Sequence, residues 1–200
     1  MSQQVKGNTT MMKNYLLSAW HIVDPIYYLF TRLQYVLDHE NEKTIFRVRL
    51  TRYKGSPATL QDGTEIKRND LLLKRHLHNV RILTELHSIR SELKRAVLIY
   101  HLVKRALPRL AYYVQTHNRY HDIKGIIGIT SLFRSADRLG FEMMPIHNTF
   151  YRHYKKNTFI FIQLLANNTI SNDPVYLFMS KGELIKKYTS KKSSGSHAPY

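Results

Sequence analysis

The stretch that decides the fold reads IFRVRLTRY, residues 45–53, in which apolar and polar side chains alternate. In an extended chain Phe46 and Val48 fall on one face, and Arg47 and Arg49 fall on the other. This pattern predicts a half-buried β-strand with one face in the core and one cationic face.

Strand and turn signals continue on both sides of this stretch. Residues 61–64 read QDGT, and an Asp-Gly pair is typical of a tight primed hairpin turn because it tolerates positive φ. A second strand is expected over residues 71–78, so this region predicts a small antiparallel meander. Before it, a helix is expected over residues 13–36, bent or split at Pro25.

The second half of the chain interleaves helices and strands. Apolar residues recur every three or four positions from Val80 to Tyr100, which indicates helices, and Pro108 is expected to kink or restart the second of them. A helix that begins at Thr130 or Ser131 is expected to end at Gly140. The other expected elements are strands at 123–130, 141–146 and 175–179 and helices at 149–167 and 182–188. Without a βαβ rhythm, the chain is predicted to be a single α+β domain, a small antiparallel β-meander plus several packed helices.

The ends of the chain differ from its body. Residues 1–12 are polar and unpatterned, and residues 189–200 are of low complexity. We therefore expect a flexible N-terminus at 1–12, one folded domain at 13–188 and a disordered basic tail at 189–200. An apolar content of 43% supports a packed core. The absence of cysteine excludes disulfides, thiolate zinc sites and cysteine nucleophiles.

Hydropathy limits the location that we expect. No run approaches the ~18 apolar residues of a membrane span, and no cleavage pattern follows the apolar residues 15–23. We expect a cytoplasmic protein that can lie at the periphery of the membrane. Trp20, Tyr27, Tyr28 and Phe30 of the first helix are expected in the core, with a membrane interface as the alternative.

Positive charge is the strongest indication of function. The chain has 31 Lys and Arg against 14 Asp and Glu, a formal net charge of +17. Residues 1–12 contribute one lysine and residues 186–200 contribute four, so the body keeps +12. Because this excess repels itself and solubility does not require it, a negatively charged partner is predicted. The leading candidates are an anionic polymer or a membrane surface, through phospholipid headgroups or an anionic glycan.

Arginine is the residue type expected to contact such a partner, since guanidinium groups bind phosphate and carboxylate in a bidentate manner. The predicted anion contacts are Arg47, Arg49, Arg75, Arg134 and Arg138. Their predicted polar companions are His76, His78 and Asn79. For each group alone the simpler interpretation is a solvated or ion-paired surface, as for Arg134 and Arg138 beside Asp137.

Histidine spacing supplies weak candidates for a metal site. His76 and His78 share one face of a strand, and His117 and His121 share one face of a helix end. His76 and His78 have no nearby carboxylate in the sequence, whereas His117 and His121 have Asp122 adjacent, and the two pairs would give four ligands if the fold brought them close. Eleven histidines in 200 residues produce such spacings easily. The sequence therefore predicts no metal and no cofactor.

Catalytic motifs are also missing. The sequence has no Gly-x-Ser-x-Gly, phosphate-binding Gly-rich loop, His-Glu-x-x-His or dinucleotide fingerprint, so an enzyme is not favoured. The spacing Gly125-x-x-Gly128 is that of an RNA-clamping KH loop, but Ile126 and Ile127 favour packed backbone. Two alternatives stay open beside the binding or accessory protein: a nucleic-acid-binding protein, and a hydrolase or transferase acting on glycans or phosphoesters.

Several segments resemble one known family. They are DPIYY at 24–28, IFRVRLTRYKG at 45–55, Asn69-Asp70 through His76-Leu77-His78-Asn79, GIIGIT at 125–130 and RLGFE at 138–142. Over residues 13–188 the chain resembles the YkoP-like proteins of spore-forming bacilli. Domains of this type also occur beside polysaccharide deacetylase domains, so the resemblance implies a role around envelope glycans or glycolipids. It implies no catalytic residues, and this chain lacks the deacetylase Asp-Asp motif.

Overall fold

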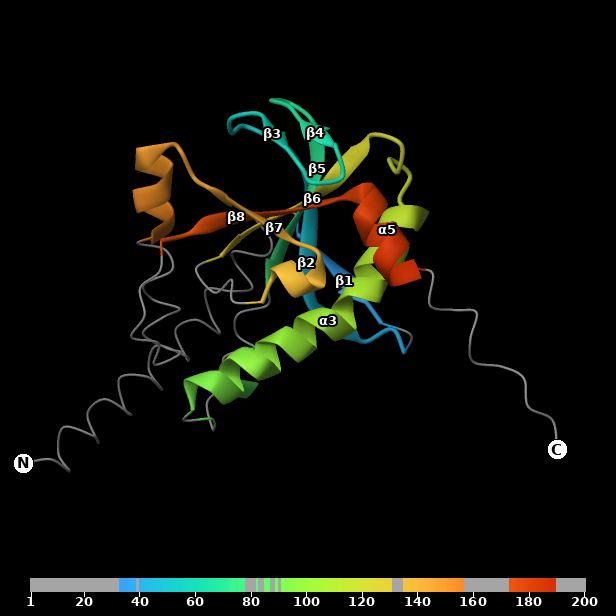
Figure 1. The fold of residues 1–200 in the computed structure, drawn as a ribbon. Helices are drawn as coiled ribbons and strands as arrows, with labels where there is room; N and C mark the ends of the chain where they lie inside the picture. Colours follow the sequence, from blue (N-terminus) through green and yellow to red (C-terminus); the bar gives the residue numbers. More distant parts are fainter. Residues whose placement is uncertain are drawn as a thin grey trace, which may run out of the picture.

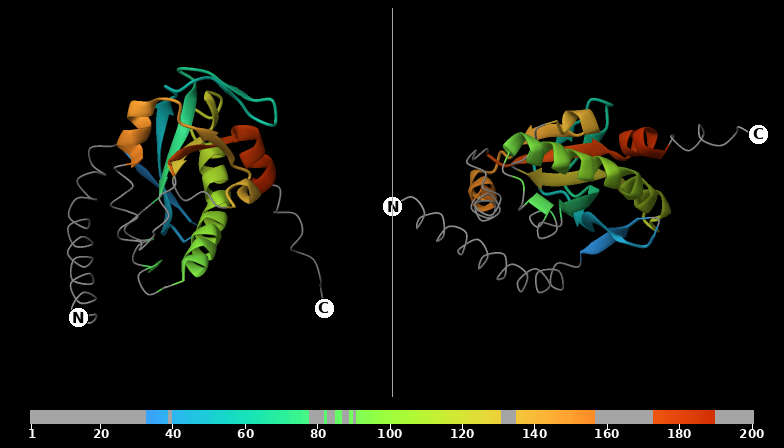
Figure 2. Two further views of the ribbon diagram at one scale, coloured as in Figure 1. Left: turned by 60° about the vertical axis from the view of Figure 1, so that its left-hand side comes forward. Right: turned by 90° about the horizontal axis from the view of Figure 1, so that it is seen from below.

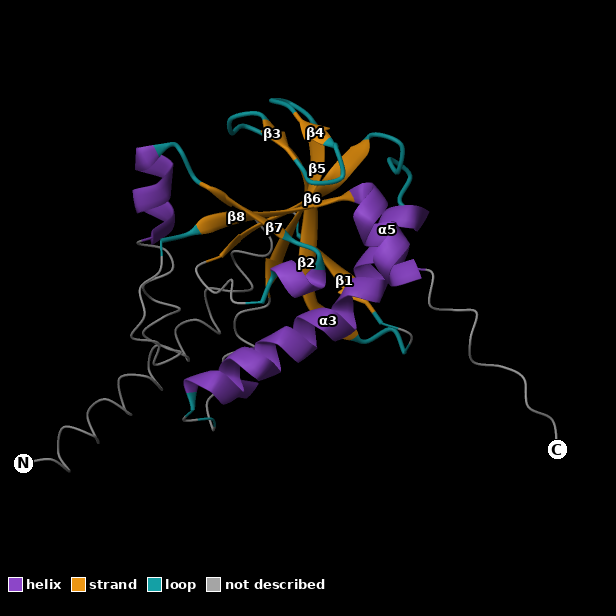
Figure 3. Ribbon diagram, in the orientation of Figure 1, coloured by secondary structure: helices purple, strands orange, loops and turns teal. Residues whose placement is uncertain are grey.

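Figure 1 shows the fold in a computed structural model, which describes residues 33–38, 40–77, 82, 85–86, 89, 91–130, 135–156 and 173–189. One sheet contains β1 (Gln34–Leu37), β2 (Lys43–Arg52), β5 (Leu71–Leu77), β6 (Ile123–Thr130), β7 (Glu142–Pro145) and β8 (Val175–Ser180). A separate hairpin contains β3 (Ala58–Thr59) and β4 (Glu65–Ile66). The helices are α3 (Glu92–Thr116), the short η1 (Asp137–Leu139), α5 (Lys181–Thr189) and a helical stretch at 149–156. The predicted α+β class is confirmed (Figure 3).

The strand order of the large sheet is β1-β2-β5-β6-β8-β7. Neighbouring strands are antiparallel except for β5 and β6, which are parallel and are joined through α3. The sequence predicted an antiparallel meander, and β2 and β5 form an antiparallel pair, but it predicted no partner for the strands at 123–130, 141–146 and 175–179. The sheet is strongly twisted, so that β2 and β5 run nearly vertically in Figure 1 while β7 and β8 run nearly horizontally.

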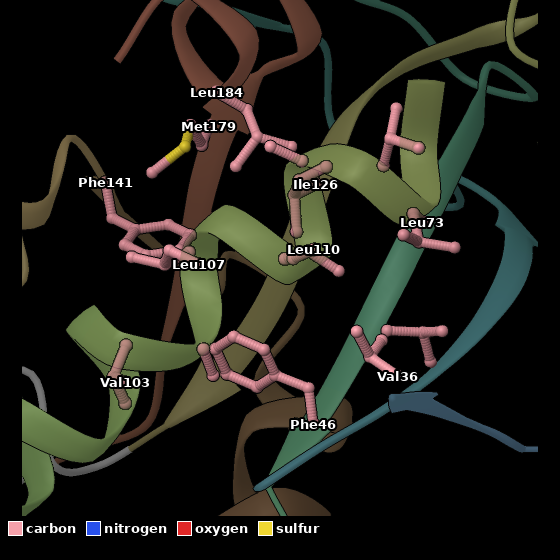
Figure 4. Close-up of a cluster of buried hydrophobic side chains, with 14 of the residues drawn as sticks. Val36, Phe46, Leu73, Val103, Leu107, Leu110, Ile126, Phe141, Met179 and Leu184 are labelled. Atoms are coloured by element: carbon pink, nitrogen blue, oxygen red, sulfur yellow. The ribbon is translucent and has the colours of Figure 1, made fainter. Parts of the chain in front are cut away.

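The main core lies between the sheet and the pair of helices α3 and α5. Phe46 and Val48 enter it from β2, as the alternation predicted, and Leu107 and Leu110 enter it from α3. Figure 4 shows Phe46, Leu107 and Leu110 in this core. All four side chains are fully buried. This core fixes the orientation of β2, and with it the direction in which Arg47 and Arg49 point.

The opposite face of the sheet carries a smaller apolar cluster under the β3–β4 hairpin. Leu60 and Ile66 of the hairpin region pack with Leu72, Ile127 and Phe178 of the sheet. The hairpin is seen above the sheet in the left-hand view of Figure 2. It shields one end of this face, and the strands β2 and β5 continue beyond it.

The hairpin turn differs from the predicted one. Gly63 N–H donates to Leu60 C=O at 2.9 Å, and Gly63 has the positive φ of 81°, whereas Asp62 does not have positive φ. The turn is therefore an ordinary turn followed by a left-handed glycine rather than a two-residue primed turn. Asp62 instead accepts a hydrogen bond from the buried Ser180 hydroxyl, which ties the turn to the start of α5.

Four expectations about helices need correction or confirmation. Residues 34–37 form β1 rather than the end of a helix, because they pair with β2. Helix α3 runs through Pro108 without restarting. Gly140 has φ 85° and closes η1 in the left-handed conformation, as predicted. The helix expected from Thr130 or Ser131 is wrong, because Thr130 pairs with Val175 at the end of β6, Ser135 has a positive φ of 62°, and among the described residues of this stretch only 137–139 form a short 3-10 helix. The expected helix before Pro25, and the continuation of the 149–156 helix to 167, lie outside the described residues.

Candidate anion-binding site

Two cross-strand pairs place four basic side chains on one face of the sheet. In the antiparallel ladder of β2 and β5, Arg47 is opposite His76 and Arg49 is opposite Lys74. Directly opposite residues project from the same face of a sheet, about 5 Å apart. This face is the one that does not carry α3, because Val48 and Leu73 on the alternate positions belong to the main core.

A fifth basic residue, Lys155, reaches this face from the helical stretch 149–156. Its charge lowers the pKa of Lys74, and the Arg49 charge lowers the pKa of Lys155, in both cases after a larger effect of burial. We call Arg47, Arg49, Lys74, His76 and Lys155 the cationic cluster. The cluster brings together two neighbouring strands and a helix more than 75 residues away in the sequence.

The pKa values of Lys74 and His76 are lowered by burial and by the positive charges around them. Burial first, and then Lys155 and Arg49, lower the pKa of Lys74 to about 8. Burial first, and then Lys74 and Arg49, lower the pKa of His76 to about 3. His76 is therefore neutral at pH 7. Its buried Nε2 atom has no hydrogen-bond partner.

No carboxylate of the described residues neutralises Arg49, Lys74 or Lys155. The ion pairs among the described residues lie elsewhere: Lys67–Glu65, Arg119–Asp122, Lys124–Asp70 and Lys156–Asp173. Like charges opposite each other in a ladder are destabilising. The Arg49–Lys74 pair is thus a cost to the fold that an anion would relieve.

Arg47 is held differently from the rest of the cationic cluster. Its Nη2 donates to the Tyr35 hydroxyl at 2.5 Å, and its guanidinium lies 4.8 Å from the centre of the same ring. Tyr35 is the residue opposite Arg47 in the β1–β2 ladder. This contact orients the Arg47 side chain along the cationic face.

Next to the cationic cluster, the pairing between the parallel strands β5 and β6 ends before either strand ends. Pairing of β5 with β6 stops at Lys74 and Ile127, although β5 continues to Leu77 and β6 to Thr130. We call this divergence the strand split, flanked by residues 75–77 and 128–130.

Arg75 lies beside the strand split but on the opposite face from the cationic cluster. Its guanidinium is 5.5 Å from the ring centre of Phe46 and 4.3 Å from that of Phe141, inside the main core. Burial lowers the pKa of Arg75 to about 10, so the group remains charged at pH 7. Its buried Nη1 atom has no hydrogen-bond partner.

The structure thus brings together Arg47, Arg49 and His76 of the residues predicted from sequence. Arg75 is on the other face, and the exposed Arg138 lies in η1. Arg134, His78 and Asn79 lie outside the described residues. The prediction missed Lys74 and Lys155. The register of β2 against β5 would have indicated Lys74, but nothing in the sequence indicates which face the 149–156 helix covers.

Histidines do not assemble a metal site in the part of the chain that the structure describes, where no group of three potential ligands occurs. His117 lies in the tight turn after α3, where its Nδ1 accepts from the Arg119 N–H at 3.0 Å. His121 is exposed.

The Gly125-x-x-Gly128 stretch is buried in β6, where a Cβ on Gly125 would lie 2.6 Å from the Met179 carbonyl oxygen. Packed backbone, rather than a nucleic-acid clamp, accounts for these glycines.

Fold and site together define a class: a basic α+β protein with a cationic sheet face beside a split parallel strand pair. The chain belongs to the YkoP domain family, whose model matches residues 13–188. It is 44% identical over 184 residues to a protein of Bacillus subtilis (strain 168) described as "Uncharacterized protein YkoP", covering 90% of this chain and 100% of that protein. No solved structure matches. Among the described helices, none has the length and apolar character needed to cross a membrane.

Proposed function

We propose that this protein is a binding or accessory protein that engages an anionic partner in bacterial envelope polysaccharide or glycolipid metabolism. The observation that carries the proposal is the cationic cluster, in which Arg49, Lys74 and Lys155 face one another without a carboxylate among the described residues. The partner's phosphate or carboxylate group would supply the missing negative charge.

Electrostatics gives the size of the effect. Two unit charges about 4 Å apart interact by about 4 kcal/mol at an effective dielectric constant of about 20. An anion in contact with Arg49 and Lys74 gains two such attractions and also screens the repulsion between the two cations. The partial burial of Lys74 makes these interactions stronger than those of the exposed lysines on α3.

Exposed aromatic side chains next to the cationic cluster favour a lipid-linked partner over a free polymer. Phe150 is 90% exposed and Tyr154 is 62% exposed. They are one helical turn apart on the stretch that also carries Lys155, so aromatic and cationic groups are presented together. Aromatic rings beside basic residues are typical of proteins that rest on an anionic membrane surface.

The family resemblance points in the same direction. Domains of the YkoP type beside polysaccharide deacetylases suggest that the anionic group belongs to an envelope glycan or glycolipid. We place the protein on the cytoplasmic side, peripheral to the membrane. It needs no catalytic residue for this role.

Vesicle co-sedimentation tests the proposal. We expect the wild-type chain to sediment with vesicles of phosphatidylcholine that contain phosphatidylglycerol, and the Arg49→Gln/Lys74→Gln variant to lose at least tenfold in affinity. The matched control is Lys94→Gln/Arg105→Gln, which removes the same charge from exposed positions of α3. We expect its affinity to fall less than threefold.

Two results would contradict the proposal. Equal losses in both variants would mean that net charge alone attracts the vesicles. Displacement of the protein from vesicles by duplex or single-stranded oligonucleotide at matched phosphate concentration would favour the nucleic-acid alternative.

A further inference from the structure

Three cations of the cationic cluster come from three separate elements. Arg49 projects from β2, Lys74 lies opposite it on β5, and Lys155 belongs to the helical stretch 149–156. The charges of Arg49 and Lys155 both act on Lys74, and the charge of Arg49 acts on Lys155, so the three groups lie near one another. All three side chains are partly exposed, so an anion can reach them from solvent without a cavity in the fold.

The described part of the chain supplies no acceptor to these three cations. The Arg49 Nε atom has no hydrogen-bond partner, and the ion pairs between described residues include none of the three. Arg47, the other arginine of the cluster, bonds to the Tyr35 hydroxyl instead. A guanidinium has five N–H donors and an ammonium has three, so a ligand that satisfies this set needs several acceptor oxygens.

Lys155 is restrained without being neutralised. Its Nζ lies 5.5 Å from the ring centre of Tyr151 and 5.3 Å from that of Tyr154. Cation–π contacts of this kind restrict the position of an ammonium, but the rings carry no net charge. The full charge of Lys155 therefore remains available to an anion that also contacts Arg49 and Lys74.

The number of charges separates the anions that fit this set. His76 is neutral at pH 7, and Lys74 is mainly protonated, so the three cations present nearly three positive charges. A phosphodiester brings one negative charge and two terminal oxygens. A phosphomonoester brings nearly two negative charges at pH 7 and three terminal oxygens. The monoester neutralises more of the set and has one oxygen for each cation.

We infer that the cationic cluster selects a terminal phosphate monoester over a phosphodiester, with Arg49, Lys74 and Lys155 each binding one terminal oxygen. The phosphate can belong to a lipid headgroup, as in phosphatidic acid, or to a small soluble ester, because the chemistry that the cluster recognises is the same. This inference rests on the proposed function, since it names the anionic group that the same site takes.

Co-sedimentation with two kinds of vesicle tests the selectivity. Phosphatidylcholine vesicles carry either phosphatidic acid, a monoester, or phosphatidylglycerol, a diester, in amounts that give the same zeta potential. We expect the wild-type chain to bind the phosphatidic acid vesicles at least tenfold more tightly. Lys155→Gln should reduce this ratio below threefold. The matched control is Lys156→Gln, which removes the neighbouring lysine that pairs with Asp173, and it should keep the ratio.

Phosphorus NMR of glycerol 3-phosphate gives a second readout that needs neither a vesicle nor a variant. A site that binds the dianion tenfold more tightly than the monoanion lowers the second pKa of the bound phosphate from about 6 to about 5. Glycerophosphoglycerol, a soluble diester, should bind at least tenfold more weakly. Preference for the monoester in both assays assigns the selectivity to the phosphate group itself. A preference seen with vesicles, together with no binding of either soluble ester, assigns it to a lipid headgroup.

Three results would overturn the inference. Equal affinity for the two kinds of vesicle would do so and would leave the proposed function standing, provided that Arg49→Gln/Lys74→Gln still loses affinity for both. A ratio that is unchanged in Lys155→Gln would remove the contact to the third oxygen. Bound glycerol 3-phosphate whose second pKa stays near 6 would show no preference for the dianion. Failure of the wild-type chain to bind either kind of vesicle would overturn the proposed function as well.

Discussion

Replacement of Arg75 by methionine should stabilise the protein when no ligand is present. Burial lowers the pKa of Arg75 from its usual 12.5 to about 10. At about 1.4 kcal/mol per pKa unit, the folded state bears a penalty of about 3 kcal/mol for keeping this group charged at pH 7. Methionine has a similar length and removes the charge, so the variant no longer bears this penalty.

The net effect is smaller because Arg75 also interacts with two rings. Each contact, to Phe46 and to Phe141, is worth about 1 kcal/mol, so a gain of about 1 kcal/mol remains. For a chain of this size it raises the melting temperature by about 2–4 °C. Urea unfolding and calorimetry at pH 7, on wild type, Arg75→Met and Arg75→Lys, measure the change. A loss of stability of 2 kcal/mol or more in Arg75→Met would show that the guanidinium is a structural element of the core and refute the reasoning.

Three further predictions concern the cationic face and the sheet. The affinity for inorganic phosphate should fall as the pH rises from about 8 to about 10, because Lys74, with its pKa lowered to about 8, must be protonated to pair with the anion. Titration of the protein with phosphate over this pH range measures the fall, and Lys74→Gln should abolish it. His76 has a pKa of about 3 in the folded protein against about 6.5 when unfolded, so the unfolded chain binds an extra proton between these two pH values. The free energy of unfolding should therefore decrease by about 1.4 kcal/mol per pH unit as the pH falls from about 6 to about 4. In urea titrations, His76→Leu should flatten this slope. Gly125→Ala should destabilise by about 2 kcal/mol or more, since the new Cβ would lie 2.6 Å from the Met179 carbonyl oxygen; an unchanged urea midpoint would mean that β6 and β8 separate at little cost.

Local pattern predicted much of the fold, because the core of the sheet is built from alternating strands. The strand over residues 45–53 and the strand over residues 123–130 are found almost to the residue. The left-handed Gly140 was also predictable, since glycine is favoured where φ is positive. The parallel pairing of β5 with β6 was not predictable, because it depends on the path of α3 across the sheet rather than on any short stretch. For the same reason the helix assigned to residues 34–36 was wrong: their pairing with β2 is a long-range contact.

The candidate site was predictable only in part, for a similar physical reason. Alternation within β2 placed Arg47 and Arg49 on one face, and that geometry is a property of one strand. The neighbours of these arginines depend on register, which sets Lys74 opposite Arg49 and His76 opposite Arg47. Arg75 was grouped with them by residue type, but its place one residue after Lys74 puts it on the other face. The prediction of anion contacts by charge alone therefore merged two environments that the sheet separates.

Strand β5 connects these two environments, because Lys74, Arg75 and His76 are consecutive and project alternately to its two faces. An anion on the cationic cluster would act beside the buried Arg75, at the point where the β5–β6 ladder ends. Burial is the largest cause of the lowered pKa of Lys74, and repulsion by the charges of Lys155 and then Arg49 lowers it further. That repulsion is present in the free protein and acts on the last paired residue of β5 before the strand split. An anion that neutralises this repulsion should raise the pKa of Lys74 and stabilise this end of β5. Phosphate should therefore raise the melting temperature of the wild-type chain more than that of Arg49→Gln/Lys74→Gln, and an equal rise in both would contradict the role of the cationic cluster.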